Sequence, residues 1–534
     1  MTKPHGLLVA AASALLLSAF TMTVPLSAQT VLRLDEHAIG EIDPAKATDY
    51  ADSMIFYNIY DTLVIPAAGG TDILPHLAES WTIDGQTYTF TLRDDVKFHS
   101  GNVMDSDDVA FSIERKMALG QGFSSLFAGV IDSVETPDAR TVSITLTEPF
   151  APFLGSLVRL AIVDKDAVLE NLAEGDYGDL GDYGQAYLTS NTAGTGAYTI
   201  SSHNPQELTV MEKNPDYFLG VPAEAPDTAE LQYAIEPATL RALITRGELD
   251  IGDQWMAPEI KAAVSAEEGV SLGQVAGISS FYLKLNNQRP PLDDVHCRRA
   301  FAHAYDYDAI LEQTQVTDEI AFGRRAYGPL PLGVLGSDEN IPTGRFDLDA
   351  ARSELEQCQY DPGDHEIQLN WVAGNPIQER IQLMMQLNLG ELGFETTITT
   401  TPWAMFTELA ATAERTPHVS PVNFILTTPD PDSMLYTMYH SNAVGTWASV
   451  DWVMNDEVDS LIEAGRTETD PETRAAIYRE LGNMLVEDQV SIFAYELVGV
   501  FPIRDVVHVP ALQEEGKTYS VQGMNFMLRE MTMN

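Results

Sequence analysis

The chain has 534 residues, of which 79 are acidic and 30 are basic, and its formal net charge at pH 7 is −49. A charge of this sign and size repels phosphate backbones and anionic membrane surfaces, so nucleic-acid binding is not expected. A hydrophobic content of 45% with 9% aromatic residues predicts packed cores rather than disorder. The length is sufficient for two or three compact units.

Residues 1–28 have the pattern of a signal peptide. Lys3 precedes an apolar run from Leu7 to Phe20, and Leu26-Ser27-Ala28 offers a small residue for cleavage before Gln29. A membrane anchor is the alternative, but the run is shorter than the roughly 20 residues that span a bilayer. No Cys follows the run, so a lipid anchor is not indicated. We therefore expect a free protein exported to the periplasm.

The first part of the mature chain alternates predicted strands and helices. Val31–Leu34 is the first predicted strand, and Tyr88–Leu92 has the period-2 alternation of a strand with one buried face. A helix capped by Asp105 or Ser106 follows, and Val142–Leu146 is the next strand.

Glycines mark the next segment. Gly194-Thr195-Gly196 lacks the further residues of a dinucleotide or phosphate loop, so it is interpreted as a tight turn. Strands are predicted around Ile200, at Leu208–Met211 and at Leu249–Gly252.

A second block begins near Phe281 and contains both cysteines. Cys297 shares one helical face with apolar residues, and Cys358 does the same on a helix that Asp347 could cap. Both thiols are therefore expected to face a core. A disulfide between them and two buried free thiols both explain the pattern. Near the C-terminus, Asp470 is the predicted cap of a further helix.

Residues 77–115 carry a family resemblance. The segments LAESW, DG-x-TYTF-x-LR, VKFH-x-G and DV-x-FS occur there in this order. They resemble the extracytoplasmic solute-binding proteins of family 5, which serve ABC importers of oligopeptides, dipeptides, nickel chelates and oligosaccharides. Asn214–Phe218 and the segment from Phe281 through the Cys297 helix extend the resemblance over essentially the whole mature chain.

The resemblance implies an α/β, two-lobe periplasmic-binding-protein fold with mixed sheets, a hinge between the lobes and an extra subdomain in the first lobe. The boundaries expected from it are 29–66, 188–285 and 503–534 for lobe I, 67–187 for the inserted subdomain, and 286–502 for lobe II.

The resemblance also implies ligand contacts in two segments. In Thr427-Thr428-Pro429-Asp430, backbone groups are expected to follow the ligand, and Asp430 is expected to neutralise a peptide ammonium. A simple turn is the alternative for Asp430, and Asp432 is expected to cap a helix that begins at Ser433. Thr48-Asp49-Tyr50, after Ile42-Asp43-Pro44, is the expected contact from the first lobe; the alternative is a solvated loop.

Tryptophans are the remaining candidates. Trp255, Trp403, Trp447 and Trp452 could stack on a sugar or line a side-chain pocket, although core or rim positions explain tryptophans equally well.

Motifs of enzymes and cofactor sites do not accompany these residues. The sequence contains no G-x-S-x-G and no H-E-x-x-H, and its 11 His are scattered, so neither catalysis nor a metal or other cofactor is expected. The favoured interpretation is a monomeric receptor that binds a peptide and delivers it to an ABC permease. An oligosaccharide or another solute is the second candidate cargo, and a secreted hydrolase is the unsupported third reading.

Overall fold

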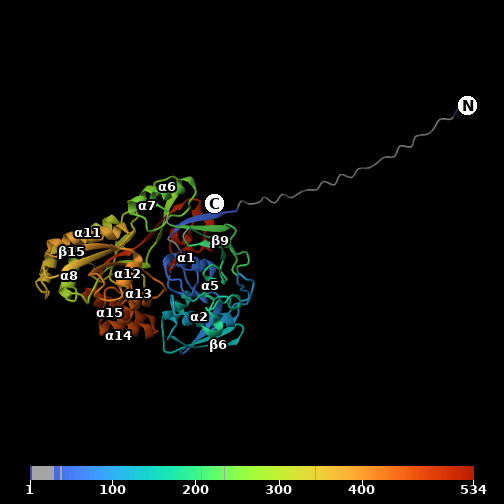
Figure 1. Cartoon of the computed structure of the whole chain (residues 1–534), viewed down its shortest axis with the longest axis horizontal. Coiled ribbons are helices and arrows are strands. Elements are labelled where there is room, and N and C mark those ends of the chain that lie inside the picture. Colours follow the sequence, from blue (N-terminus) through green and yellow to red (C-terminus); the bar gives the residue numbers. More distant parts are fainter. Residues whose placement is uncertain (3–28, 37–38, 206, 234, 343) are drawn as a thin grey trace.

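The computed structural model describes residues 1–2, 29–36, 39–205, 207–233, 235–342 and 344–534. The predicted signal peptide, apart from its first two residues, lies outside this part. Two bodies lie side by side, one around α1 and β9 and the other around α8, α11 and β15 (Figure 1). Within the described ranges, no helix combines the length and the apolar character that a membrane crossing requires.

The first body contains a mixed sheet. Its strand order is β1-β10-β9-β8, in which β1 pairs in parallel with β10 and the other pairs are antiparallel. The antiparallel pair β11-β18 joins this sheet through Ile251, which bridges Leu34 and Ile503. The bounds are β1 Val31–Glu36, β8 Tyr198–Asn204, β9 Leu208–Lys213, β10 Thr228–Tyr233, β11 Val270–Val275 and β18 Gly499–Arg504.

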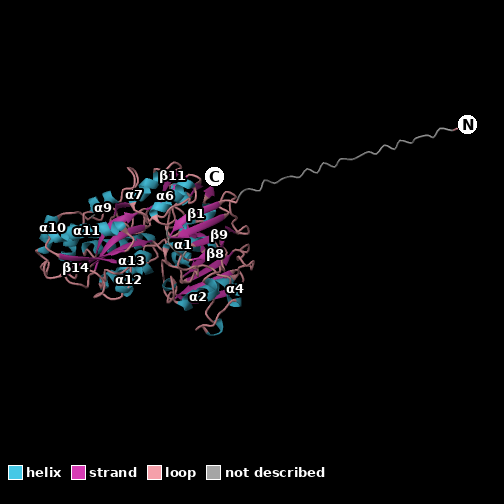
Figure 2. Ribbon diagram, turned by 45° about the horizontal axis from the view of Figure 1, so that its top comes forward, coloured by secondary structure: helices cyan, strands magenta, loops and turns pink. Residues whose placement is uncertain are grey.

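The second body is built on a six-stranded sheet in the order β13-β17-β12-β16-β14-β15. Figure 2 shows β14 of this sheet among the surrounding helices. β12 lies between β17 and β16, and all seven of its residues are buried. The bounds are β12 Ser279–Leu285, β13 Gly323–Arg325, β14 Glu366–Val372, β15 Glu395–Thr401, β16 Val419–Ile425 and β17 Ser491–Leu497.

A separate antiparallel sheet, in the order β4-β5-β7-β6, lies inside the range expected for the inserted subdomain. α2 packs on it, next to β6 at the lower end of the first body in Figure 1. The bounds are β4 Ala78–Asp84, β5 Thr87–Leu92, β6 Ile131–Asp138 and β7 Thr141–Leu146; the short pairs are β2 Val64–Pro66 with β3 Ile73–Pro75 and β19 Val507–His508 with β20 Thr532–Met533.

Helices cover the sheets. Their bounds are α1 Tyr50–Ile59, α2 Ser106–Leu119, α3 Phe153–Ser156, α4 Lys165–Glu170, α5 Gln185–Leu188, α6 Pro237–Arg246, α7 Pro258–Ser265, α8 Val295–Ala304, α9 Tyr307–Gln313, α10 Leu348–Leu355, α11 Pro376–Glu391, α12 Trp403–Leu409, α13 Asp432–Tyr439, α14 Asp456–Thr467, α15 Pro471–Glu487 and α16 Pro510–Gln513. The side chains of Asp105, Asp347 and Asp470 cap α2, α10 and α15 by accepting backbone N–H groups, as the sequence predicts.

The chain passes between the two bodies twice. It leaves the first sheet after β11 and enters the second at β12, and it returns between β17 and β18, at Val498. The boundaries expected at 285/286 and 502/503 are therefore misplaced by about one strand each. The reason is that an apolar strand pattern shows burial but not which sheet the strand joins.

Three local predictions are wrong. Leu249–Gly252 is not a strand, and Ile251 alone in this segment forms isolated bridges. Gly194 and Gly196 are not a tight turn; a Cβ on either would meet the backbone of α1, since the carbonyl oxygen of Ile59 would lie 2.0 Å from a Cβ at Gly194. These glycines allow two backbones to approach closely. Cys358 lies beyond the end of α10 and is half-buried rather than in a core.

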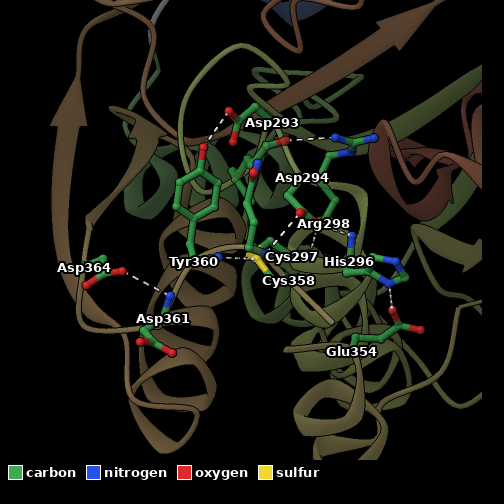
Figure 3. The surroundings of a disulfide bond; sticks show 12 residues. Asp293, Asp294, His296, Cys297, Arg298, Glu354, Cys358, Tyr360, Asp361 and Asp364 are labelled. Carbon is green, nitrogen blue, oxygen red and sulfur yellow. Dashed lines mark hydrogen bonds and ion pairs between the residues drawn. A yellow bond between two sulfur atoms is a disulfide. The ribbon is translucent and has the colours of Figure 1, made fainter. Parts of the chain in front are cut away.

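A disulfide joins Cys297 and Cys358 (Figure 3). It connects α8 to the segment that follows α10. Nearby, Tyr360 donates its hydroxyl to Asp293 at 2.9 Å, and the backbone N–H of Gln359 donates to Asp294 at 3.2 Å. The bridge and these bonds hold the edge of the second body together.

Candidate functional site

A pocket lies where the first body meets the second sheet. The chain between the Ile251 bridge and the start of α7 forms one wall, and β16, β17 and the start of α11 form the other. The residues that line it are Gln254, Trp255, Met256, Ala257, Pro258, Lys261, Phe322, Asn375, Pro376, Ile377, Asn423, Tyr495 and Leu497.

The first wall is fixed at its base by an ion pair with a buried carboxylate, that of Asp250. Asp250 accepts a hydrogen bond from Arg504 at 2.7 Å and another from the backbone N–H of Arg33 at 2.9 Å. Because these bonds join the loop to β1 and β18, the chain that follows leaves the sheet at a defined place. Pro258 then begins α7, where its missing N–H costs nothing.

Aromatic rings form much of the pocket surface. The rings of Tyr50 and Trp255 meet edge to face, with centroids 6.5 Å apart. On the other wall, Tyr495 stacks on Phe281 at 4.8 Å. Burial, together with the nearby carboxylates of Glu36 and Asp253, raises the pKa of Tyr50 well above its usual value, so this phenol stays neutral.

Lys261 is the buried cation of the pocket. Lys261 is 2% exposed, and its Nζ lies 5.2 Å from the ring centroid of Phe322. Burial lowers the pKa of Lys261 to about 8, and the negative charge of Asp253 partly opposes this. Across the described residues, no hydrogen bond or ion pair reaches this ammonium group.

Two amide side chains add polar atoms to the walls. Nε2 of Gln254, a donor, and Oδ1 of Asn423, an acceptor, are buried and have no hydrogen-bond partner among the described residues. Buried amide atoms normally have partners. In a pocket between two bodies, such atoms are suited to bind a solute.

The first predicted segment does not line the pocket, but its Tyr50 lies against Trp255, which does. Thr48 and Asp49 are exposed, and Asp49 caps α1 by accepting from the backbone N–H of Asp52 at 3.0 Å. The carbonyl of Thr48 accepts from Gln522 at 3.1 Å. Of this segment, only Tyr50 is brought against Trp255.

The second predicted segment lies at a contact between the two bodies. The carbonyl of Thr427 accepts a hydrogen bond from Arg159, which follows α3 in the first body, and Thr428 is buried. Asp430 forms a buried bidentate ion pair with Arg474, at 2.6 and 2.8 Å. Its Oδ1 also accepts the backbone N–H of Asp432 at 2.9 Å, which is the turn geometry that the sequence left open.

Asp432 is not the helix cap that the sequence predicts. α13 begins at Asp432 itself, and its cap position is Pro431. The side chain of Asp432 is buried, and Arg466 lies 3.3 Å from its carboxylate. Burial raises the pKa of Asp432 to about 7, although Arg466 opposes the shift. The Asx turn at Asp430 shifts the start of the helix by one residue.

The other predicted tryptophans belong to a different cluster. Trp447 stacks on Phe424 at 5.8 Å and meets Trp403 edge to face at 5.3 Å. Phe424 neighbours Asn423 on β16, and successive side chains of a strand point to opposite faces. The Trp403 and Trp447 cluster is therefore on the other face of the sheet from the pocket. Trp452 donates its indole N–H to Thr416 at 3.0 Å.

Lys261, Gln254 and Asn423 are site residues that the sequence reasoning missed. A signal for Lys261 exists, because it shares a buried helix face with Pro258 and Val264 at three-residue spacing. A lysine on the apolar face of a short helix indicates a buried charge. No comparable pattern marks the two amides.

Within the described ranges, no group of three His, Cys, Asp or Glu side chains is placed to hold a metal ion. Two α/β bodies, two chain crossings and a pocket walled by both define a two-lobe solute-binding protein.

Comparison with known proteins agrees with this class. The model of the bacterial extracellular solute-binding proteins, family 5, matches residues 72–446, and the chain belongs to this family. It is 27% identical over 464 residues to the probable D,D-dipeptide-binding periplasmic protein DdpA of Escherichia coli (strain K12), covering 85% of this chain and 86% of that protein.

Two further similarities show the range of the family. The chain is 27% identical over 459 residues to heme-binding protein A of Haemophilus influenzae, covering 81% of this chain and 80% of that protein. Its fold matches the periplasmic binding protein DppA of Helicobacter pylori in complex with the peptide STSA, with a TM-score of 0.78, 24% identity, and coverage of 94% and 98%.

Proposed function

We propose that this protein is the periplasmic receptor of an ABC importer, and that it binds a peptide between its two lobes and presents it to the membrane permease. The observation that carries the proposal is the pocket with one wall from each lobe. A solute in such a pocket binds the closed arrangement better than the open one, so it drives closure. No covalent chemistry is required.

Peptide is the favoured cargo for two reasons. The E. coli relative is named as a D,D-dipeptide-binding protein, and the H. pylori structure contains a peptide. The pocket also combines rings with buried amide donors and acceptors, which suits backbone amides as well as side chains. An oligosaccharide or another solute is the second candidate, because the same rings and amides can bind sugars.

The remaining parts of the proposal concern location and assembly. Residues 1–28 direct export and are removed, and the mature protein works as a monomer. Its strongly acidic composition keeps such a monomer soluble.

Ligand binding and closure test the proposal together. Native mass spectrometry of protein purified without refolding identifies any solute that co-purifies, and a panel of peptides and oligosaccharides is then titrated by calorimetry. Binding should raise the melting temperature by mass action and reduce the radius of gyration in small-angle scattering. Binding without compaction would contradict a closing receptor. Turnover of the peptides or sugars would instead favour the hydrolase.

A further inference from the structure

Lys261 of α7 differs in one respect from Lys284, a buried lysine of the neighbouring sheet. Lys284 is fully buried on β12, but Asp451 lies 2.8 Å from its Nζ and compensates its charge. Lys261 is buried to a similar degree, and no described residue forms an ion pair with it. A buried charge without a partner is strongly unfavourable, so such groups are retained where something outside the chain compensates them.

The surroundings of Lys261 give only partial compensation. The face of Phe322 attracts the ammonium at 5.2 Å, and Asp253 acts at longer range. Glu259, on the same helix, is engaged with Arg380 of α11 at 2.9 Å. The carboxylates on the nearby elements therefore leave the Nζ of Lys261 without a direct partner.

The opposite wall contains the N-terminus of α11, whose first turn also carries Glu379. The first turn of α11, at Asn375, Pro376 and Ile377, lines the pocket. The N-terminus of a 16-residue helix carries partial positive charge. Two features from different lobes, an ammonium and a helix N-terminus, thus face one pocket.

We propose that the pocket takes solutes that carry a carboxylate, and that Lys261 is the residue that binds it. This inference rests on the proposed receptor function and specifies its cargo. The acceptor Oδ1 of Asn423 and the donor Nε2 of Gln254 then bind the uncharged polar part of the solute, and Trp255 covers its apolar part. A peptide carboxylate and a sugar acid share this chemistry; a neutral oligosaccharide lacks it.

Calorimetry with matched probes tests the proposal. The probes are trialanine, its C-terminal amide, glucuronic acid and glucose. The unmodified protein should bind one of the two acids about 100-fold more tightly than its neutral counterpart, as is typical when one partner of a buried charge pair is removed. Trialanine would identify a peptide carboxylate, and glucuronic acid would identify a sugar acid.

Two variants separate a binding role from a structural one. Lys261→Met keeps the apolar stem and Lys261→Gln keeps a polar end, and both remove the charge. Each should reduce acid affinity to the level of the neutral probe while leaving neutral-probe affinity within about threefold. Lys97→Met, which changes an exposed lysine, is the matched control and should bind like the unmodified protein.

The outcomes distinguish the two proposals. Equal affinity for acid and neutral probes, or unchanged preference for the acid in both Lys261 variants, overturns the carboxylate site and leaves the receptor intact. A protein that binds none of the probes and co-purifies with no solute overturns both. Circular dichroism and a melting curve for each variant confirm that the protein compared is folded.

Discussion

The guanidinium of Arg474 holds the carboxylate of Asp430 in two parallel hydrogen bonds, and the pair is buried beside the contact between the lobes. Arg474 also donates to the hydroxyl of Tyr478 at 3.0 Å and to the carbonyl of Gly465 at 2.6 Å. Asp430 therefore already has an internal cation. A peptide ammonium at Asp430, as the sequence resemblance implies, would have to share the carboxylate with Arg474.

This geometry predicts a stability effect for Asp430→Asn. The substitution keeps the shape but leaves Arg474 as an uncompensated buried charge, so the free energy of unfolding should fall by about 3–5 kcal/mol. Urea denaturation measures the change. Asp349→Asn is a suitable control, because its carboxylate pairs with Arg352 on an exposed helix surface, where such pairs contribute little. A change below about 1 kcal/mol at Asp430 would contradict the structural role.

The ammonium role of Asp430 has a separate test that needs no substitution. If a peptide ammonium binds this carboxylate, N-acetylated trialanine should bind at least about 30-fold more weakly than trialanine, as for other buried charge pairs. Similar affinities for the two peptides in calorimetry would leave Asp430 as a turn and ion-pair residue.

The disulfide gives a second stability prediction. Cys297 and Cys358 close a loop with a sequence separation of 61 residues. In the chain-entropy model such a cross-link restricts the unfolded chain and contributes about 4 kcal/mol, and measured effects are typically 2–4 kcal/mol. The double variant Cys297→Ser, Cys358→Ser should be destabilised by this amount in urea. Both thiols of the native protein should resist alkylation after denaturation without reductant; rapid alkylation would contradict the bridge.

The sequence was most informative where one local interaction decides the structure. Caps at Asp105, Asp347 and Asp470 depend on a side chain and the next few N–H groups, so they were predictable. The lobe boundaries and the pocket were not, because they depend on which distant strands pair and on which loops meet. The sequence makes Tyr50 and Trp255 candidates separately, but its pattern does not show that the two rings meet.

Asp430 and Lys261 illustrate the same limit for charges. The sequence placed Asp430 in the right segment, yet its partner Arg474 is 44 residues away and carries no sequence mark of the pairing. For Lys261 the unusual feature is a missing partner, which only the packing of α7 against the second lobe reveals. Electrostatic roles therefore required the three-dimensional arrangement.

A further prediction concerns the ion pair between α7 and α11. Glu259 of α7 and Arg380 of α11 come from different lobes and are largely exposed, at 61% and 37% of their side-chain surface. Exposed pairs contribute about 0–1 kcal/mol and are screened by salt. Glu259→Gln should therefore weaken solute binding less than tenfold at low ionic strength, and the difference should vanish in 1 M salt. A loss that persists in high salt would assign Glu259 a direct contact with the solute.

The last prediction follows from the pKa of Lys261, which burial lowers from 10.5 to about 8 in the folded protein. This lowering of the pKa means that the charged form of Lys261 reduces the free energy of unfolding by about 3 kcal/mol. The unfolded chain binds the proton more tightly, so the penalty is fully present below pH 8 and is relieved as the pH rises from 8 to 10.5. Lys261→Met should consequently unfold at higher urea concentration than the unmodified protein at pH 7.

The pH dependence of this difference is the decisive measurement. The stability advantage of Lys261→Met should be about 3 kcal/mol at pH 7, should shrink as the pH rises from 8, and should vanish above pH 10.5, where the lysine is neutral in both the folded and the unfolded state. Other groups titrate alike in both proteins and cancel in the difference. Lys97→Met should show no such trend, since Lys97 is exposed and its substitution removes no buried charge. A Lys261→Met protein that is less stable at pH 7 would show that Lys261 has a stabilising partner, and the carboxylate of a bound solute would no longer be needed to explain its burial.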